Sequence, residues 1–144
     1  DIQDVIEKMG PLDGATEFLA WLRERCQVII LSDTFYQFAQ PLMRQLGFPT
    51  LFCNQLEIDA SGRIVNYHMR MQDPKKHAVA ALKSLNFYTM AAGDSYNDTT
   101  MLREADAGFF FCPPEHLPKE FPQFPVTQTY GELQEWFAKA GHLQ

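Results

Sequence analysis

The sequence has few cysteines, no long apolar run and no excess of positive charge, and each shortage excludes a class of protein. Its three cysteines, Cys26, Cys53 and Cys112, are widely spaced and lie beside apolar residues. We therefore expect reduced thiols in the core and no disulfide framework. No stretch approaches the roughly 18 apolar residues of a membrane span, and the acidic, polar first residues are unlike a signal peptide. These features predict a cytoplasmic protein without a membrane partner.

Positive charge is scarce, with 12 Lys and Arg residues against 18 Asp and Glu residues and a formal net charge of −6. A chain of this charge is not expected to bind nucleic acid or an anionic membrane. It can still bind a small anion, because a bound Mg²⁺ and a few backbone N–H groups reverse the local field. With 144 residues, 46% of them hydrophobic, the chain is long enough for one domain with a single core.

Apolar runs alternate with helical patterns along most of the sequence. Strands are predicted over residues 28–32, 49–53, 87–92, 107–112 and 123–127. Helices are predicted over residues 2–9, 14–25, 35–46, 74–85 and 99–105, and again near the C-terminus. A β-hairpin is predicted over residues 55–70, where alternating faces flank Ala60-Ser61-Gly62. This order indicates an α/β fold with a mostly parallel sheet, helices on both faces and an added β-hairpin.

The most informative stretch is Gly93-Asp94-Ser95-Tyr96-Asn97-Asp98, which follows a predicted strand and precedes a predicted helix. Ligands bind at the carboxyl ends of parallel strands, where the following helix N-termini carry partial positive charge. Asp94 and Asp98 offer two carboxylates at such an end, and hard oxygen ligands suit Mg²⁺. The alternative is that Ser95, Asn97 or Asp98 caps the next helix and binds no ligand.

Two other segments have the chemistry for binding phosphate. Ser32 ends a predicted strand before a helix, where a hydroxyl and backbone N–H groups can hold an anion. Asp73-Pro74-Lys75-Lys76 begins a helix, since proline is favoured in the first turn, and a lysine there can act as a point charge on a phosphate. Helix phasing does not separate Lys75 from Lys76. His68 is expected to be an exposed strand residue, because no second His or Cys stands at ligand spacing.

A strand ending in serine, a lysine at a helix start and a strand followed by Gly-Asp-Ser-x-Asn-Asp occur here in that order. They resemble motifs two, three and four of the haloacid dehalogenase-like phosphatases. Within that superfamily the chain resembles the phosphoserine phosphatases, most closely the ThrH type, which is also a phosphoserine:homoserine phosphotransferase. The resemblance covers nearly the whole chain, notably residues 21–25, 31–36, 40–50 and 93–101. It implies a haloacid dehalogenase-like Rossmannoid fold.

The resemblance also implies a reaction and a metal. The expected activity is Mg²⁺-dependent hydrolysis of the phosphomonoester O-phosphoserine through an aspartyl-phosphate, with water or homoserine as the phosphoryl acceptor. By the same resemblance Asp94 binds Mg²⁺, and Asp98 holds the ion directly or through water. The sequence does not distinguish between the two acceptors.

The remaining motif residues are expected to handle the phosphoryl group. The resemblance implies that Ser32 and the N–H of Asp33 bind its oxygens, and that Asn97 contacts the substrate or the phosphate. Lys75 is expected to neutralise the oxygens and to orient the nucleophile, so that Lys75 and Ser32 are the candidate catalytic residues. The local Asp-Pro-Lys sequence favours Lys75 over Lys76 for this role.

The chain departs from the family at motif one, Asp-x-(Asp/Glu)-x-(Thr/Val), which follows an N-terminal strand and supplies the nucleophile. Asp1 and Asp4 lie instead in an amphipathic helical pattern without a preceding apolar strand. By resemblance, residues 1–10 are a remnant of the helical cap and residues 11–144 an incomplete core lacking its central first strand. We therefore expect the chain alone to be inactive, its gap closed by self-association or by an N-terminal segment supplied in trans.

Two other functions fit parts of the pattern. A non-catalytic module or pseudo-phosphatase that binds phosphate or Mg²⁺ would need the same residues without the nucleophile. The receiver domain of a two-component regulator also combines a parallel sheet with acids, a hydroxyl and a lysine. A receiver requires a phosphoacceptor aspartate after its third strand, where this chain has Cys53-Asn54, so we reject that interpretation.

Overall fold

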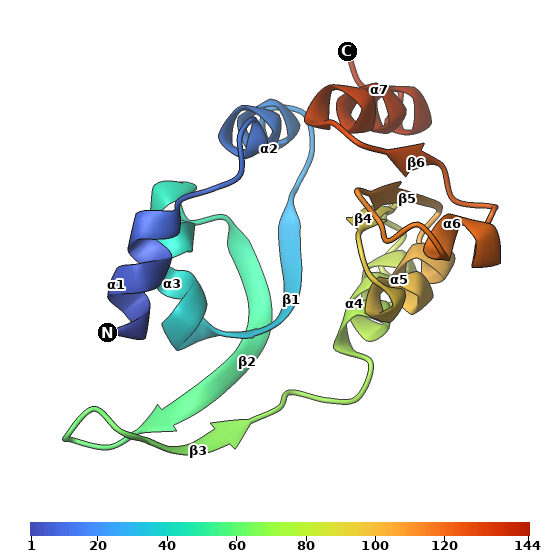
Figure 1. The fold of residues 1–144 in the computed structure, drawn as a ribbon. Coiled ribbons are helices and arrows are strands. Elements are labelled where there is room, and N and C mark those ends of the chain that lie inside the picture. The colour runs from blue at the N-terminus through green and yellow to red at the C-terminus, as the bar shows by residue number, and fades with distance from the viewer. The chain divides into compact units, whose positions relative to one another are not determined.

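The computed structural model describes all 144 residues, which form two compact units, Asp1–Gln72 and Asp73–Gln144. Each unit has its own three-stranded sheet and its own helices (Figure 1). Three of the four strand pairings are parallel, which confirms the predicted α/β class with a mostly parallel arrangement. The predicted boundary near residue 10 between cap and core stays a prediction.

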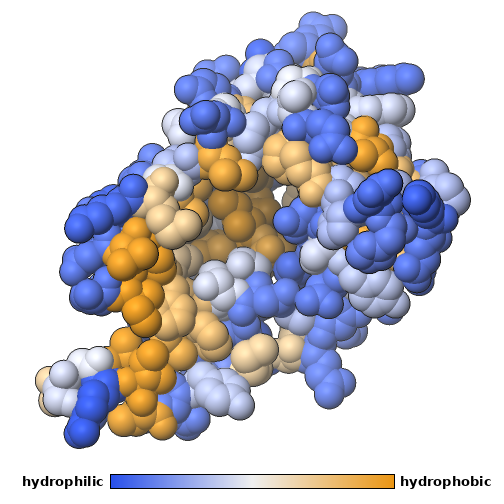
Figure 2. Space-filling model, in the orientation of Figure 1, coloured by the Kyte–Doolittle hydropathy of each residue, from blue (hydrophilic) through white to orange (hydrophobic).

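The first unit contains a sheet of order β1-β2-β3 and three helices. The helices are α1 (Ile2–Met9), α2 (Ala15–Arg23) and α3 (Tyr36–Gln45), and the strands are β1 (Ile29–Phe35), β2 (Thr50–Ile58) and β3 (Ile64–His68). The α1 helix lies against α3, where the Gln3 side chain donates to the Gln37 carbonyl at 2.6 Å and the Gln45 side chain donates to the Glu7 carbonyl at 2.9 Å. Apolar side chains remain exposed over α1 and the hairpin (Figure 2).

The β2 strand is longer than the sequence predicted. The separate strands expected at residues 49–53 and 55–59 are wrong, because they form one continuous strand. Its first half pairs in parallel with β1, as in Leu31↔Phe52, and its second half pairs antiparallel with β3, as in Glu57↔Asn66. Asn54 does not interrupt the strand, because its polar side chain is buried and hydrogen-bonded. The predicted hairpin turn is confirmed.

The ends of the neighbouring elements also differ from prediction in two places. The β1 strand runs beyond Ser32 to Phe35, so α3 begins one residue later than expected. The α2 helix ends at Arg23, two residues earlier than predicted, and Gly14 precedes it in the left-handed region with φ 85°. The predicted stop of α3 at Gly47 is confirmed: Gly47 has φ 78°, and its N–H and that of the next residue bond back to the last turn.

The second unit has the parallel sheet β4-β5-β6. Its helices are α4 (Pro74–Ser84), the short 3₁₀ turn η1 (Tyr96–Asp98), α5 (Thr99–Glu104), α6 (Leu117–Glu120) and α7 (Tyr130–Gly141). Its strands are β4 (Met90–Gly93), β5 (Ala107–Phe111) and β6 (Val126–Thr127). Buried apolar side chains between sheet and helices form the core of this unit, among them Leu102, Phe109, Phe110, Leu117, Leu133 and Phe137. The predicted final edge strand is present but shorter than expected.

The cysteines are free, as predicted, but one of them is not in the core. Cys53 is buried and Cys26 is half-buried, whereas Cys112 is exposed at the end of β5 with φ 46°. The prediction of three core thiols is therefore wrong for Cys112, because the chain turns sharply there and leaves the sheet. None of the helices combines the length and the apolar character that crossing a membrane requires.

Candidate active site

The loop after β4 is built around the carboxylate of Asp98. Its Oδ2 accepts hydrogen bonds from the backbone N–H of Asp94 at 2.9 Å and of Ser95 at 3.1 Å, and from the Ser95 hydroxyl at 3.3 Å. Ser95 and Asp98 form a capping box at the start of η1. The capping role foreseen for Ser95 and Asp98 is therefore confirmed. Asp98 is 4% exposed, so this carboxylate fixes the backbone of the loop from inside.

The other oxygen of the same carboxylate is bound by Lys75. The Lys75 Nζ lies 2.7 Å from Asp98 Oδ1. Lys75 is partly buried at the first turn of α4, whereas Lys76 is exposed. Burial alone would raise the pKa of Asp98, but the hydrogen bond and charge of Lys75, together with two loop amides, outweigh it and hold the pKa below its usual range. The structure thus places an ion pair at the carboxyl end of β4.

Gly93 is required at the end of β4 because the Asp98 side chain packs directly on its backbone. A Cβ added at Gly93 would lie 2.5 Å from the Asp98 Cβ and 2.6 Å from its Cγ. Real carbon atoms do not approach so closely, so any other residue would push Asp98 away. The glycine of the Gly-Asp-Ser sequence therefore serves the burial of Asp98.

The start of α4 is tied to the start of α5. Asp73 adopts the left-handed region with φ 47°, directly before Pro74 in the first turn. Its carboxylate accepts a hydrogen bond from the Thr100 hydroxyl at 2.8 Å. This contact holds the first turn of α4, which carries Lys75, beside the helix that follows Asp98.

Asp94 and Asn97 project from the same loop into solvent. Both are exposed, and the Asp94 carboxylate makes no hydrogen bond or ion pair within the chain. No group of three or more His, Cys, Asp or Glu side chains converges as a complete metal site. Mg²⁺ needs only one or two protein carboxylates and takes its other ligands from water and phosphate. Asp94 fits such a partial site, while both Asp98 oxygens are already engaged by the chain.

Ser32 and Asp33 belong to the first unit, near the end of β1. The Ser32 Oγ accepts a hydrogen bond from the Thr34 N–H at 3.2 Å, and the Asp33 carbonyl accepts one from the Asn54 side chain at 3.0 Å. The sequence did not predict this contact between Asn54 and Asp33. It left no periodic signal in the sequence, because both partners of the Asn54 side chain are distant in the chain.

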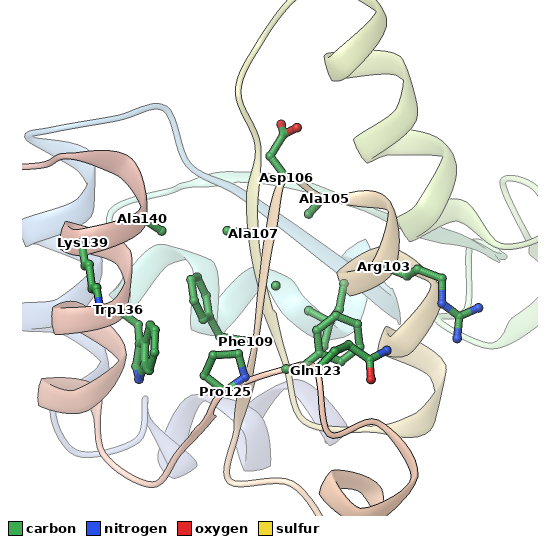
Figure 3. A pocket seen from close by; sticks show the side chains of 13 residues that line it. Arg103, Ala105, Asp106, Ala107, Phe109, Gln123, Pro125, Trp136, Lys139 and Ala140 are labelled. Carbon is green, nitrogen blue, oxygen red and sulfur yellow. The ribbon is translucent and has the colours of Figure 1, made fainter.

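The second unit also contains a cavity of about 550 Å³ (Figure 3). Its wall includes Phe109, Pro125 and Trp136 together with Ala107, the first residue of β5. Asp94 follows the last residue of β4, and β4 and β5 are parallel. The cavity therefore lies toward the end of the sheet opposite to the Asp94 loop and contains none of the predicted site residues.

Comparison with known proteins gives one consistent family. The model of the haloacid dehalogenase-like hydrolases matches residues 2–106. A curated protein of Pseudomonas aeruginosa, phosphoserine phosphatase ThrH, is 62% identical over 140 residues, covering 97% of this chain and 68% of the relative. A phosphoserine phosphatase of Pseudomonas syringae pv. tomato is 59% identical over 144 residues, covering 100% of this chain and 61% of the relative. The chain thus spans about two thirds of these relatives.

Solved structures agree on the fold. A substrate-bound phosphoserine phosphatase complex matches with a TM-score of 0.70 at 22% identity, over 85% of this chain and 62% of that one. A structure described as a phospho-aspartyl intermediate analogue of phosphoserine phosphatase matches with a TM-score of 0.69 at 20% identity, with the same coverage. At such identities the likeness shows the fold alone.

Proposed function

Because the chain belongs to the haloacid dehalogenase-like hydrolases, and within them to the phosphoserine phosphatases, we propose that it carries most of the active site of an O-phosphoserine phosphohydrolase. The observation that supports this most strongly is the contact, 2.7 Å long, between Lys75 at the first turn of α4 and Asp98 in the loop after β4. Phosphoryl transfer depends mainly on positioning and on neutralising charge. A lysine held by a buried carboxylate supplies both.

In this proposal the motif residues named from the sequence bind the phosphoryl group. Lys75 neutralises its oxygens, and the Ser32 hydroxyl and the Asp33 N–H donate hydrogen bonds to them. Asn97, which is exposed on the η1 turn, contacts the substrate. The positive end of a short helical turn and a fixed ammonium group together suit a dianionic phosphate monoester.

A metal completes the charge balance. We propose that Asp94 ligates Mg²⁺ through its exposed carboxylate and that Asp98 acts through water, since its own oxygens already accept hydrogen bonds from Lys75 and the loop amides. When bound, Mg²⁺ would polarise the phosphoryl oxygens as a Lewis acid. Within the chain, the Asp98 carboxylate binds Lys75 through one oxygen and fixes the backbone of the Asp94 loop through the other.

Asp1 and Asp4 lie at the start of a helix and not at the end of a strand, which supports the proposal that neither is the nucleophile of the aspartyl-phosphate. We propose that the nucleophile lies in a part of the relatives that this chain does not span. The strands β1 and β4 each stand at the edge of their own sheet. Water or homoserine then accepts the phosphoryl group.

The test is Mg²⁺-dependent release of phosphate from O-phospho-L-serine by the 144-residue chain, alone and with a peptide of the pattern strand-Asp-x-Glu. We expect no release by the chain alone and release with the peptide. In the supplemented system Lys75→Ala should lower turnover by at least ~10²-fold, as removal of a preorganised charge does, whereas the exposed Lys76→Ala should change little. Addition of homoserine identifies the acceptor by formation of phosphohomoserine.

Each outcome distinguishes between functions. Binding of O-phosphoserine without turnover under all conditions would favour the non-catalytic module. A large effect of Lys76→Ala with none from Lys75→Ala would show that the lysine role is misplaced by one residue. Turnover by the unsupplemented chain would contradict the proposed origin of the nucleophile.

A further inference from the structure

Asn54 is a buried polar residue that the proposed mechanism does not use. It lies within β2, only 2% exposed, between Cys53 and Gln55 in a strand that otherwise buries apolar side chains. Both ends of its side-chain amide are satisfied by backbone groups of other segments. The Nδ2 donates to the Asp33 carbonyl at 3.0 Å, and the Oδ1 accepts from the Arg70 N–H at 3.1 Å. Asn54 therefore joins the end of β1 to the segment that follows β3.

The bond to the Asp33 carbonyl acts on a single peptide plane. The carbonyl of Asp33 and the N–H of Thr34 belong to the same rigid unit. Asn54 holds its carbonyl side, and the Ser32 Oγ accepts from its N–H side at 3.2 Å. This plane lies where the register of β1 with β2 shifts, between Leu31 and Phe35. The Asn54 amide and the Ser32 hydroxyl therefore hold it from its two sides.

The orientation of that peptide plane determines the direction in which the Ser32 hydroxyl can donate its hydrogen. A hydroxyl has one hydrogen to donate and can also accept. Because the Ser32 Oγ already accepts the Thr34 N–H, its own hydrogen points elsewhere and is available to an anionic oxygen. Without Asn54 the peptide could rotate, and the hydroxyl would lose the bond that directs it.

We propose that Asn54 is a positioning residue for phosphate binding, acting through the Asp33–Thr34 peptide on the Ser32 hydroxyl. This rests on the proposed function, which places Ser32 at the phosphoryl group. Asn54 itself touches neither substrate nor metal in this scheme. Its second bond, to the Arg70 N–H, anchors the segment that follows β3.

The test is a double-mutant cycle in the 144-residue chain, read as the Kd for inorganic phosphate with Mg²⁺ present by titration calorimetry. Asn54→Leu removes the amide donor without adding charge, and Ser32→Ala removes the hydroxyl. Each single change is expected to weaken phosphate binding by about tenfold, the scale of one hydrogen bond to a charged group. The double variant should be no weaker than Ser32→Ala, because Asn54 acts through the hydroxyl. Asn66→Leu, an exposed position on β3, is the control and should leave Kd unchanged.

The outcomes separate this proposal from the proposed function. If Ser32→Ala weakens binding and Asn54→Leu does not, or if the two losses multiply to about a hundredfold, Asn54 has no positioning role while the phosphate site stands. If the unaltered chain does not bind phosphate at all, both proposals fail. Should Asn54→Leu not fold, amide exchange in the unaltered chain decides. The Thr34 amide must then exchange at least ~10-fold slower than an exposed amide, and a fast rate overturns the proposal.

Discussion

Replacing Asp98 by asparagine tests the centre of the site most directly, because it changes the charge and almost nothing in size. The new side-chain amide would still present one oxygen to the loop amides of Asp94 and Ser95. Its NH₂ group would then face the Lys75 ammonium, donor against donor, at the place where the wild-type pair is 2.7 Å apart. The partly buried lysine would lose its contact with this carboxylate.

The expected cost follows from how little of the pair is exposed. The Lys75 side chain is 13% exposed and that of Asp98 is 6% exposed. Removing one partner of a buried ion pair costs about 3 to 5 kcal/mol. Because Lys75 keeps some contact with water and can turn outward, we expect about 3 kcal/mol of lost unfolding free energy, at the lower end of that range.

The assay is urea denaturation followed by circular dichroism, with Asp106→Asn as the matched control. Asp106 also faces a lysine, with Lys83 Nζ at 3.6 Å from its Oδ1, but these side chains are 35% exposed for Lys83 and 30% exposed for Asp106. The control should therefore cost no more than about 1 kcal/mol. If Asp98→Asn costs as little as the control, the buried pair does not organise the loop and the reasoning is refuted.

The difference in unfolding free energy between the wild type and Asp98→Asn should depend on pH in a definite direction. The pKa of Asp98 is lowered in the folded chain relative to its ordinary value of about 3.9. Its stabilising effect is therefore fully present above that ordinary value and is lost as the pH falls through the lower, folded pKa. The stability gap between the wild type and Asp98→Asn should stay constant above about pH 4 and shrink below it. A gap that widens in acid would contradict the assigned charge state.

Two further predictions concern packing and thiol exposure. Gly93→Ala should lower the unfolding free energy by about 1 to 3 kcal/mol, because the new Cβ would lie 2.5 Å from the Asp98 side chain. Gly131→Ala is the control, because the atom nearest to its new Cβ is 3.8 Å away, and it should change the unfolding free energy by no more than about 0.5 kcal/mol. Equal losses for the two variants in urea titrations would contradict this account. Cys112 should react with a thiol reagent well before Cys53, because Cys112 is exposed, whereas burial raises the pKa of the Cys53 thiol. Peptide mapping of the labelled chain measures the two rates, and faster labelling of Cys53 would show that β2 opens.

The predictable part of the fold was set by local signals. Helix 2–9 is found as predicted because an amphipathic pattern begins after Asp1, whose side chain caps the helix, and ends before Gly10. Pro74 likewise begins α4 where the sequence placed it. In both cases the deciding residues are neighbours in the chain. Such signals need no knowledge of tertiary contacts.

The predictions from the sequence failed where contacts between residues distant in the chain determine the local structure. Asn54 was taken as the end of a strand, because a polar residue after an apolar run usually ends one. It stays inside β2 because two backbone groups distant in sequence, at Asp33 and Arg70, bond to its amide. Cys112 was placed in the core because it ends an apolar run, yet the backbone turns at that residue. Neither partner nor turn leaves a periodic trace in the sequence.

For the site as well, the sequence motif named the candidate residues, and only the structure shows how their side chains contact one another. From the sequence, Asp98 had two interpretations, helix cap or metal-site residue, that seemed to compete. In the structure one carboxylate caps the turn through Oδ2 and holds Lys75 through Oδ1, so capping and charge placement are one arrangement. The capping role of Asp98 therefore does not exclude the role that we propose for it beside Lys75. A carboxylate that caps its own loop is fixed in position, and a fixed carboxylate is what a catalytic lysine needs as a partner.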